Sequence, residues 1–193
     1  MKHFALSIAA VSLICSPIAL AEKNDIDIEA KKATYLSAMK ELGGALKSEL
    51  KAAIKAGGPI KGVEVCHTEA PKISAKLLEK KGFSIKRVSL KPRNANHAPD
   101  EWEKAVLKQF EERKAKGEKP KTLDFHEIIE KDGQRQLRYM KAIRVSAPCL
   151  TCHGSEIEPD IQDQLKKLYP EDKATGYQAG DLRGAISITE TLP

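Results

Sequence analysis

The feature that constrains this chain most is the five-residue motif Cys149-Leu150-Thr151-Cys152-His153. Two cysteines separated by two residues and followed at once by a histidine form C-x-x-C-H, the attachment site of c-type haem. Each residue type has its own chemical role, since the two thiols add across the two vinyl groups of the porphyrin and the histidine binds the iron. Because the motif occurs once, we expect one covalently attached haem c, bound by Cys149, Cys152 and His153.

Two other uses of a closely spaced cysteine pair are less well supported. A thioredoxin-like redox pair normally opens a helix after a strand in a β-α-β unit, and the pattern around residues 149–153 does not predict such a unit. A zinc site needs a second pair of ligands at close spacing, and the sequence offers none. Four cysteines in 193 residues are also too few for a disulfide scaffold.

The N-terminus has the organisation of an export signal. Lys2 supplies a positive charge, and residues 4–18 form an apolar run broken only by small residues. Ala19-Leu20-Ala21 fits the A-x-A cleavage pattern. We therefore expect residues 1–21 to be a cleavable signal peptide, which agrees with the motif because c-type haem is attached outside the cytoplasm.

Two membrane-bound alternatives to cleavage are disfavoured by the same residues. The apolar run is shorter than the ~20 residues that span a bilayer, which argues against an uncleaved anchor. A lipid anchor on Cys15 is a poor match because the bulky Ile14 stands where a lipobox has a small residue. We expect the mature chain to be one haem-binding domain over residues 22–193, periplasmic and without stable membrane insertion.

The charge balance excludes one class of partner. The chain has 33 Lys and Arg against 27 Asp and Glu, a net charge of +6 that is spread along its length. It has no arginine-rich tract and no basic segment interleaved with aromatic residues, so a nucleic-acid partner is not expected. Aromatic residues make up only 5%, which means that Leu, Ile, Val and Ala must build the core.

The first half of the chain predicts helices. Residues 25–56 carry apolar side chains at three- and four-residue steps, and Gly57-Gly58-Pro59 ends that run. A short connecting segment is expected to lead to Cys66, after which Thr68 would cap a second helix that ends at Gly82.

The second half predicts an antiparallel sheet. Its hairpin signal is Lys131-Asp132-Gly133, between two runs with the composition of strands. Helices first and antiparallel strands later indicate an α+β fold. The elements expected after the first two helices are a strand over 83–90, a helix with Pro99 in its first turn, strands over 123–130 and 134–145, a helix over 159–169 and a strand over 182–192.

The sixth iron ligand is left open by the residues alone. A class I cytochrome c is a poor match, because the motif is near the C-terminus and no methionine follows it. After export, haem attachment leaves Cys66 as an unpaired cysteine in an oxidising compartment, and the predicted helix start there would favour its thiolate. A buried structural cysteine explains Cys66 equally well. The candidates are Cys66, His67, His97, His126, Met39, Met140, or no residue at all.

Four segments together resemble the Tll-type haem-binding domain family, long catalogued as a domain of unknown function. The resemblance covers the chain from about residue 30 to its end. It implies a PAS-like antiparallel sheet with flanking helices and a long N-terminal helix, and it implies that Cys66 is the axial iron ligand opposite His153. The family often has a proline where this chain has Ala95, which affects only the stiffness of that loop. The segments are Val65-Cys66-His67-x-x-Ala70-Pro71, Arg93-Asn94-x-x-His97-x-Pro99-Asp100-x-Trp102-Glu103, the C-x-x-C-H motif and Gly184-Ala185-Ile186-Ser187.

Arg93 is the remaining candidate for cofactor binding. Its planar guanidinium suits a haem propionate, and a solvated surface charge is an equally good explanation.

A thiolate opposite a histidine stabilises ferric iron, so we expect a low reduction potential and one-electron transfer to a redox partner protein. The alternative is a redox or gas sensor that acts through a separate signalling protein. An enzyme is not expected, because two protein ligands leave no open iron position.

Overall fold

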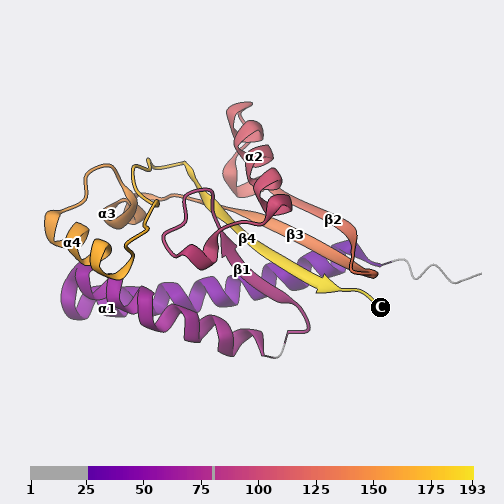
Figure 1. Cartoon of the computed structure of the whole chain (residues 1–193), viewed down its shortest axis with the longest axis horizontal. Coiled ribbons are helices and arrows are strands. Elements are labelled where there is room, and N and C mark those ends of the chain that lie inside the picture. The colour runs from indigo at the N-terminus through magenta and orange to yellow at the C-terminus, as the bar shows by residue number, and fades with distance from the viewer. Residues whose placement is uncertain (1–25, 80) are drawn as a thin grey trace, which may run out of the picture.

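The computed structural model describes residues 26–79 and 81–193 (Figure 1). The signal peptide expected over residues 1–21 lies outside the described residues. The α+β fold is confirmed, with an antiparallel sheet, flanking helices and a long N-terminal helix. The helices are α1 (Ile28–Leu78), α2 (Glu101–Ala115), α3 (Leu150–His153) and α4 (Pro159–Leu168), and the strands are β1 (Ser84–Val88), β2 (Asp124–Lys131), β3 (Gln134–Arg144) and β4 (Leu182–Thr191).

The sheet has four strands in the order β1-β4-β3-β2, and every neighbouring pair is antiparallel. The predicted hairpin joins β2 to β3, with Lys131 paired to Gln134 across the turn. Asp132 (φ 54°) and Gly133 (φ 72°) both have positive φ, as the central residues of a type I′ turn require. Such a turn matches the right-handed twist of the two strands, so the local residues set the register of the hairpin.

Helices cover both faces of the sheet, and α1 and α2 lie on opposite sides of it (Figure 1). Successive residues of β3 point to opposite faces, so Tyr139 packs with α1 and Met140 with α2. The core between α1 and the sheet contains Tyr35 and Leu42 of α1. The core between α2 and the sheet contains Phe110 of α2. Among the described residues no helix is long and apolar enough to cross a membrane.

Helix α1 is two helical arms joined by a sharp turn. Gly57 and Gly58 have non-helical backbone angles, and Gly58 has φ 72°, which favours glycine. The arms run back along each other (Figure 1), and Lys81 beyond the second arm pairs with Glu41 of the first at 2.8 Å. A Cβ atom on Gly62 would lie 2.9 Å from Cγ1 of Ile54, so the two arms touch closely there.

The prediction that the second helix starts at Thr68 is wrong. The helix resumes at Pro59, whose fixed φ suits the first helical position, and it continues through Cys66 and Thr68. The Thr68 hydroxyl donates to the carbonyl of Glu64 at 3.1 Å, as a side chain inside a helix does. Cys66 therefore lies well inside the arm. The helix-dipole argument for its thiolate fails, because the dipole acts only within the first turn.

The start of α2 also differs from the prediction by two residues. Asp100 is its N-cap, and Pro99 precedes the cap instead of lying in the first turn. The Asp100 carboxylate accepts from the backbone N–H of Glu103 at 2.8 Å, and the Glu103 carboxylate accepts from that of Asp100 at 2.9 Å. This reciprocal capping box outweighs the preference of proline for the first helical position.

Candidate functional site

The motif is folded into one tight turn of helix directly after β3. Cys149 ends a 3-10 turn over Ala147–Cys149, and Cys152 and His153 belong to α3. The Gly154 N–H donates to the carbonyl of Leu150 at 2.8 Å, and a Cβ atom on Gly154 would lie 2.7 Å from that same oxygen. The chain can therefore turn away immediately after His153 only because a glycine follows it.

The His153 ring is oriented by the backbone. Its Nδ1 lies 2.7 Å from the carbonyl oxygen of Ala174, and the His153 carbonyl accepts from the N–H of Tyr177 at 3.0 Å. A proton on Nδ1 leaves Nε2 as the atom with a free lone pair, which is the usual arrangement behind a metal-binding histidine. Burial, together with the charges of Arg93 and Arg183, lowers the pKa of His153 to about 3. The imidazole is therefore neutral, as a ligand must be.

The two thiols of the motif lie in apolar surroundings and are not joined in a disulfide. Burial raises the pKa of Cys152, and the charge of Arg93 opposes that effect. The apolar side chains near Cys149 are Val145, Ala174 and Tyr177, and those near Cys152 are Val63, Ile157, Ile161, Leu165 and Tyr169. Both cysteines are thus present as thiols, half-buried and available for covalent chemistry.

Cys66 is brought to the motif by the second arm of α1. Val63 of that arm packs in the same cluster as Cys152, and Cys66 lies three residues later on the same face of the helix. Desolvation raises the pKa of the Cys66 thiol, and the charges of Arg93 and Arg87 oppose the rise. The residue is exposed. The fold therefore places a third free thiol within electrostatic reach of the arginines beside the motif.

Two histidines also lie toward this end of the molecule. His67 is exposed, and its ring meets that of Tyr169 edge-on at 5.1 Å. His97 is half-buried, and its carbonyl accepts from the N–H of Ser89 at 3.1 Å. Burial and the charge of Arg87 lower the pKa of His97. Both residues therefore remain rivals to Cys66.

The other candidates for the sixth ligand are placed elsewhere. Met140 is fully buried in the core between the sheet and α2. Met39 packs with Tyr35 in the core between the sheet and α1. His126 is exposed on β2, at the sheet edge formed by that strand. These three residues thus lie in the two cores beside the sheet or on its β2 edge. Cys66, His67, His97 or no residue at all stay the candidates for the sixth ligand.

Arg93 links the motif to the loop that orients His153. Its Nε pairs with the carboxylate of Asp172 at 3.0 Å, and its Nη2 donates to the carbonyl of Cys152 and, at 3.5 Å, to that of Ala174. Asp172 in turn accepts from the Ala174 N–H at 2.8 Å. Arg93 thus positions the backbone on both sides of His153. Contact with a propionate stays a prediction for this residue.

Two arginines beside the motif were missed by sequence reasoning. Arg183 is 5% exposed, and its Nη1 donates to the Ser89 hydroxyl at 3.0 Å and to the Lys91 carbonyl at 3.1 Å. Its guanidinium lies 5.4 Å from the ring centre of Tyr177. Arg87 is on β1, where burial and the charge of Arg183 lower its pKa to about 10. The buried Nε atoms of both arginines have no hydrogen-bond partner among the described residues.

Gly184 fixes the backbone next to Arg183. It has φ 135°, and a Cβ atom there would lie 2.1 Å from the carbonyl oxygen of Val88, so no other residue fits without moving β1. The only sequence signal for the two arginines is the presence of charged residues inside strands that otherwise read as buried. That signal is weak, because an arginine in a strand usually points to solvent.

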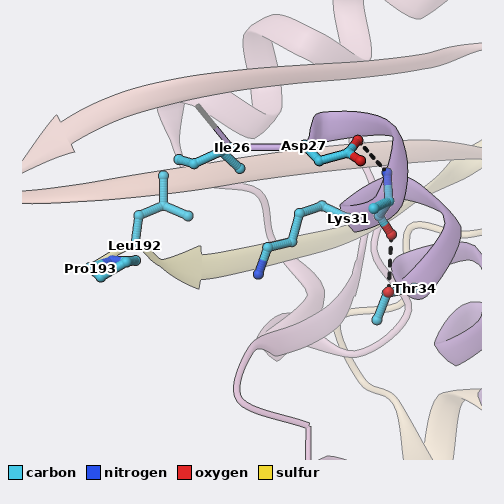
Figure 2. A pocket seen from close by; sticks show the side chains of 7 residues that line it. Ile26, Asp27, Lys31, Thr34, Leu192 and Pro193 are labelled. Carbon is cyan, nitrogen blue, oxygen red and sulfur yellow. Dashed lines mark hydrogen bonds between the residues drawn. The ribbon is translucent and has the colours of Figure 1, made fainter. Parts of the chain in front are cut away.

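A hollow of about 370 Å³ lies at the other end of the molecule from α3, where α1 begins and β4 ends (Figures 1 and 2). Its polar groups already serve the helix: Asp27 accepts from the Ala30 N–H at 2.9 Å, and the Thr34 hydroxyl donates to the Ala30 carbonyl at 3.0 Å. We assign no ligand to it. The hollow is lined by Ile26, Asp27, Ala30, Lys31, Thr34, Leu192 and Pro193.

Known proteins share the sequence pattern and the fold of this chain. The family model described as Tll0287-like matches residues 21–190. The chain belongs to the Tll0287-like family. The crystal structure of the cyanobacterial haem protein Tll0287 matches with a TM-score of 0.60 and 25% identity, over 85% of this chain and 95% of that chain. No curated protein matches. The family resemblance inferred from the four sequence segments is therefore confirmed.

The donor set of this Tll0287-like chain fits the c-type haem that the motif predicts. Cys149 and Cys152 are free thiols on one turn, and His153 is neutral with Nε2 available. The residues that the structure describes contain no group of three or more His, Cys, Asp or Glu suited to hold a metal ion on its own. The two free thiols suit attachment to a porphyrin, and the neutral imidazole of His153 suits ligation of its iron.

Proposed function

We propose that this chain is an exported monohaem c-type cytochrome that transfers single electrons at low potential. The observation that carries the proposal is the hydrogen bond from His153 to the Ala174 carbonyl beside two free thiols. That bond presets the ring as an iron ligand, and the thiols stand at the spacing that thioether attachment requires. Membership of a family that contains a haem protein supports the same conclusion.

Each residue of the site has one role in this proposal. Cys149 and Cys152 would carry the thioether links, while His153 and Cys66 would be the iron ligands. The haem, when bound, supplies exchange of one electron between ferric and ferrous iron. A thiolate from Cys66 places negative charge beside the iron, which favours the ferric state and lowers the potential. With two protein side chains as iron ligands, the protein would act as a carrier and not as an enzyme, and its partner would be a redox protein.

The second candidate function is a sensor, and the position of Cys66 favours it. Cys66 is exposed on the second arm of α1. Farther along this arm, Ile73 and Leu77 pack against the core between α1 and the sheet. Loss of Cys66 from the iron would therefore change the packing of an arm that reaches the centre of the molecule. A separate signalling protein would have to read that change.

Covalent haem is the first expectation to test. We expect the full chain, expressed in a host that exports it and attaches haem, to begin at residue 22 and to keep its colour after acid-acetone extraction. Intact-mass measurement of the denatured chain should show one added haem. The matched control is Cys149→Ala with Cys152→Ala, which should bind no haem covalently. A colourless exported protein with a disulfide between Cys149 and Cys152 would contradict the proposal.

A further inference from the structure

The motif faces more positive charge than the described residues neutralise. Three arginines, Arg87, Arg93 and Arg183, lie toward the motif. Arg93 donates to the Cys152 carbonyl, and the Arg183 guanidinium lies 5.4 Å from the ring centre of Tyr177, whose ring meets that of His153 edge-on at 6.4 Å. Of the three, Arg93 has an ion pair, with Asp172 at 3.0 Å. No carboxylate within the described part of the chain forms an ion pair with Arg87 or Arg183, and the Nε atom of each is buried without a partner. Two guanidinium groups are therefore left without an ion-pair partner in the described part of the chain.

The placement of these two arginines is set by the sheet. Arg87 lies near the end of β1, paired in register with Ile186 of β4, and Arg183 lies near the start of β4. Because the two strands are antiparallel neighbours, both positions fall at the end of the sheet toward α3 (Figure 1).

Burying a polar group or a charge without a partner is unfavourable. Arg183 is 5% exposed, and Arg87 is half-buried with its Nε atom fully buried, so both would gain from a ligand that supplies the missing acceptors. The chemistry of the group selects the ligand. The planar fork of arginine matches a carboxylate with two parallel hydrogen bonds. A haem carries two propionates, and these remain free carboxylates after its vinyl groups have reacted with the thiols.

We infer that Arg87 and Arg183 bind the propionate carboxylates of the haem. This inference rests on the proposed function and adds the residues that recognise the charged edge of the cofactor. Arg93, whose charge Asp172 neutralises, then serves mainly to position the backbone around His153. An alternative role for Arg87 is to neutralise the Cys66 thiolate, and the experiment below separates the two.

The test uses the haem-loaded full chain and the variants Arg87→Gln and Arg183→Gln. Resonance Raman spectra report the hydrogen bonding of the propionates through their bending band, and a structural role alone would not move that band. We expect the band to shift in each variant and the reduction potential to fall, because loss of a nearby positive charge disfavours the ferrous state. The control Arg135→Gln removes an exposed charge on β3 and should change neither value.

Further variants keep the outcome decisive. If Arg87→Gln does not mature as a haem protein, the variant Arg87→Lys replaces it, because lysine keeps the charge and loses the planar fork. The propionate bending band of Arg87→Lys should shift, while its reduction potential should fall less than that of a variant without the charge. An unchanged propionate band in both glutamine variants would overturn the inference. A change confined to the thiolate-sensitive electron paramagnetic resonance signal would overturn it in favour of a counter-ion to Cys66. Absence of haem from the unmodified protein would instead overturn the proposed function.

Discussion

At the scale of single residues, the tertiary structure changes the argument for Cys66. The sequence suggested a helix start, where the dipole favours a thiolate, but Cys66 lies inside the second arm of α1. Its neighbourhood does not restore that argument, because desolvation raises the pKa of the thiol although the charges of Arg93 and Arg87 oppose the rise. Placement beside the motif, and not helix position, now supports Cys66 as an iron ligand.

The ligand is decided by three alanine variants. We expect Cys66→Ala to lose the low-spin ferric signal of a thiolate ligand, to raise the reduction potential and to let carbon monoxide bind the ferrous iron freely. His67→Ala and His97→Ala should keep the low-spin signal and the potential of the unmodified protein. Electron paramagnetic resonance and a reduction titration of each variant measure both properties.

The contrary result would be equally clear. If His67→Ala or His97→Ala abolishes the low-spin signal while Cys66→Ala leaves it in place, the ligand is that histidine and the thiolate proposal is wrong. Binding of carbon monoxide by the unmodified ferrous protein would show that the sixth ligand leaves on reduction. That finding would favour sensing over simple electron transfer.

At the scale of elements, the contact between the two arms of α1 positions Cys66. Gly62 lies one turn before Cys66, and a Cβ atom there would be 2.9 Å from Ile54 and 3.0 Å from Leu50. Any large side chain at this position must push the second arm away from the first. The arm carries Val63, which packs with α4 and with Cys152. Displacement of the arm would therefore move Cys66 relative to the motif.

We expect Gly62→Leu to destabilise the protein by roughly 1–3 kcal/mol through overpacking and to weaken the low-spin signal that depends on Cys66. The matched control is Gly43→Ala in the first arm, where a Cβ atom meets nothing within 4 Å. It should stabilise the protein by up to about 1 kcal/mol, because alanine has the higher helix propensity. Denaturant unfolding measures both. Equal stability of the two variants would contradict close packing of the arms.

At the scale of the whole molecule, a buried polar network joins α2 to the sheet. Glu103 is fully buried and pairs with Lys86 of β1 at 2.9 Å and with Arg138 of β3 at 3.3 Å. Arg138 also pairs with Asp100, the N-cap of α2, at 2.7 Å. Desolvation raises the pKa of Asp100, but the N–H of Glu103 and the Arg138 guanidinium outweigh it and hold that pKa below its usual value.

Because of this network, the free energy of unfolding depends on pH in the acid range. A carboxyl whose pKa is lower in the folded state than in the unfolded state stabilises the folded state. This stabilisation is complete when the pH is above the unfolded pKa of about 3.9, and it is lost as the pH falls through the folded pKa. We expect Asp100→Asn, which keeps a capping side chain, to lower the free energy of unfolding at pH 7 by less than ~1 kcal/mol, because the ion pair is partly exposed. The gap should narrow as the pH falls below about 3.9 and the Asp100 carboxylate becomes protonated. Denaturation at pH 7 and across the acid range measures it, and an unchanged gap would contradict the role of the charge.

The sequence by itself determined what depends on local spacing. Alternation and turn chemistry predicted the β2–β3 hairpin, because Asp132 and Gly133 can adopt the positive φ values that such a turn needs. Gly57-Gly58 marked the break in α1, where Gly58 adopts a positive φ of 72°. The C-x-x-C-H spacing at residues 149–153 predicted the attachment chemistry, since that chemistry depends on neighbours along the chain. Even the family resemblance was carried by short segments of this kind.

Only the tertiary structure decided what depends on residues far apart along the chain. The bond from His153 to Ala174 spans 21 positions, and that from Arg93 to Asp172 spans 79. The approach of Cys66 to the motif follows from the packing of Val63 against α4, and the pairing of β1 with β4 gathers Arg87 and Arg183. Side-chain packing and strand order select these partners, and neither leaves a local pattern in the sequence.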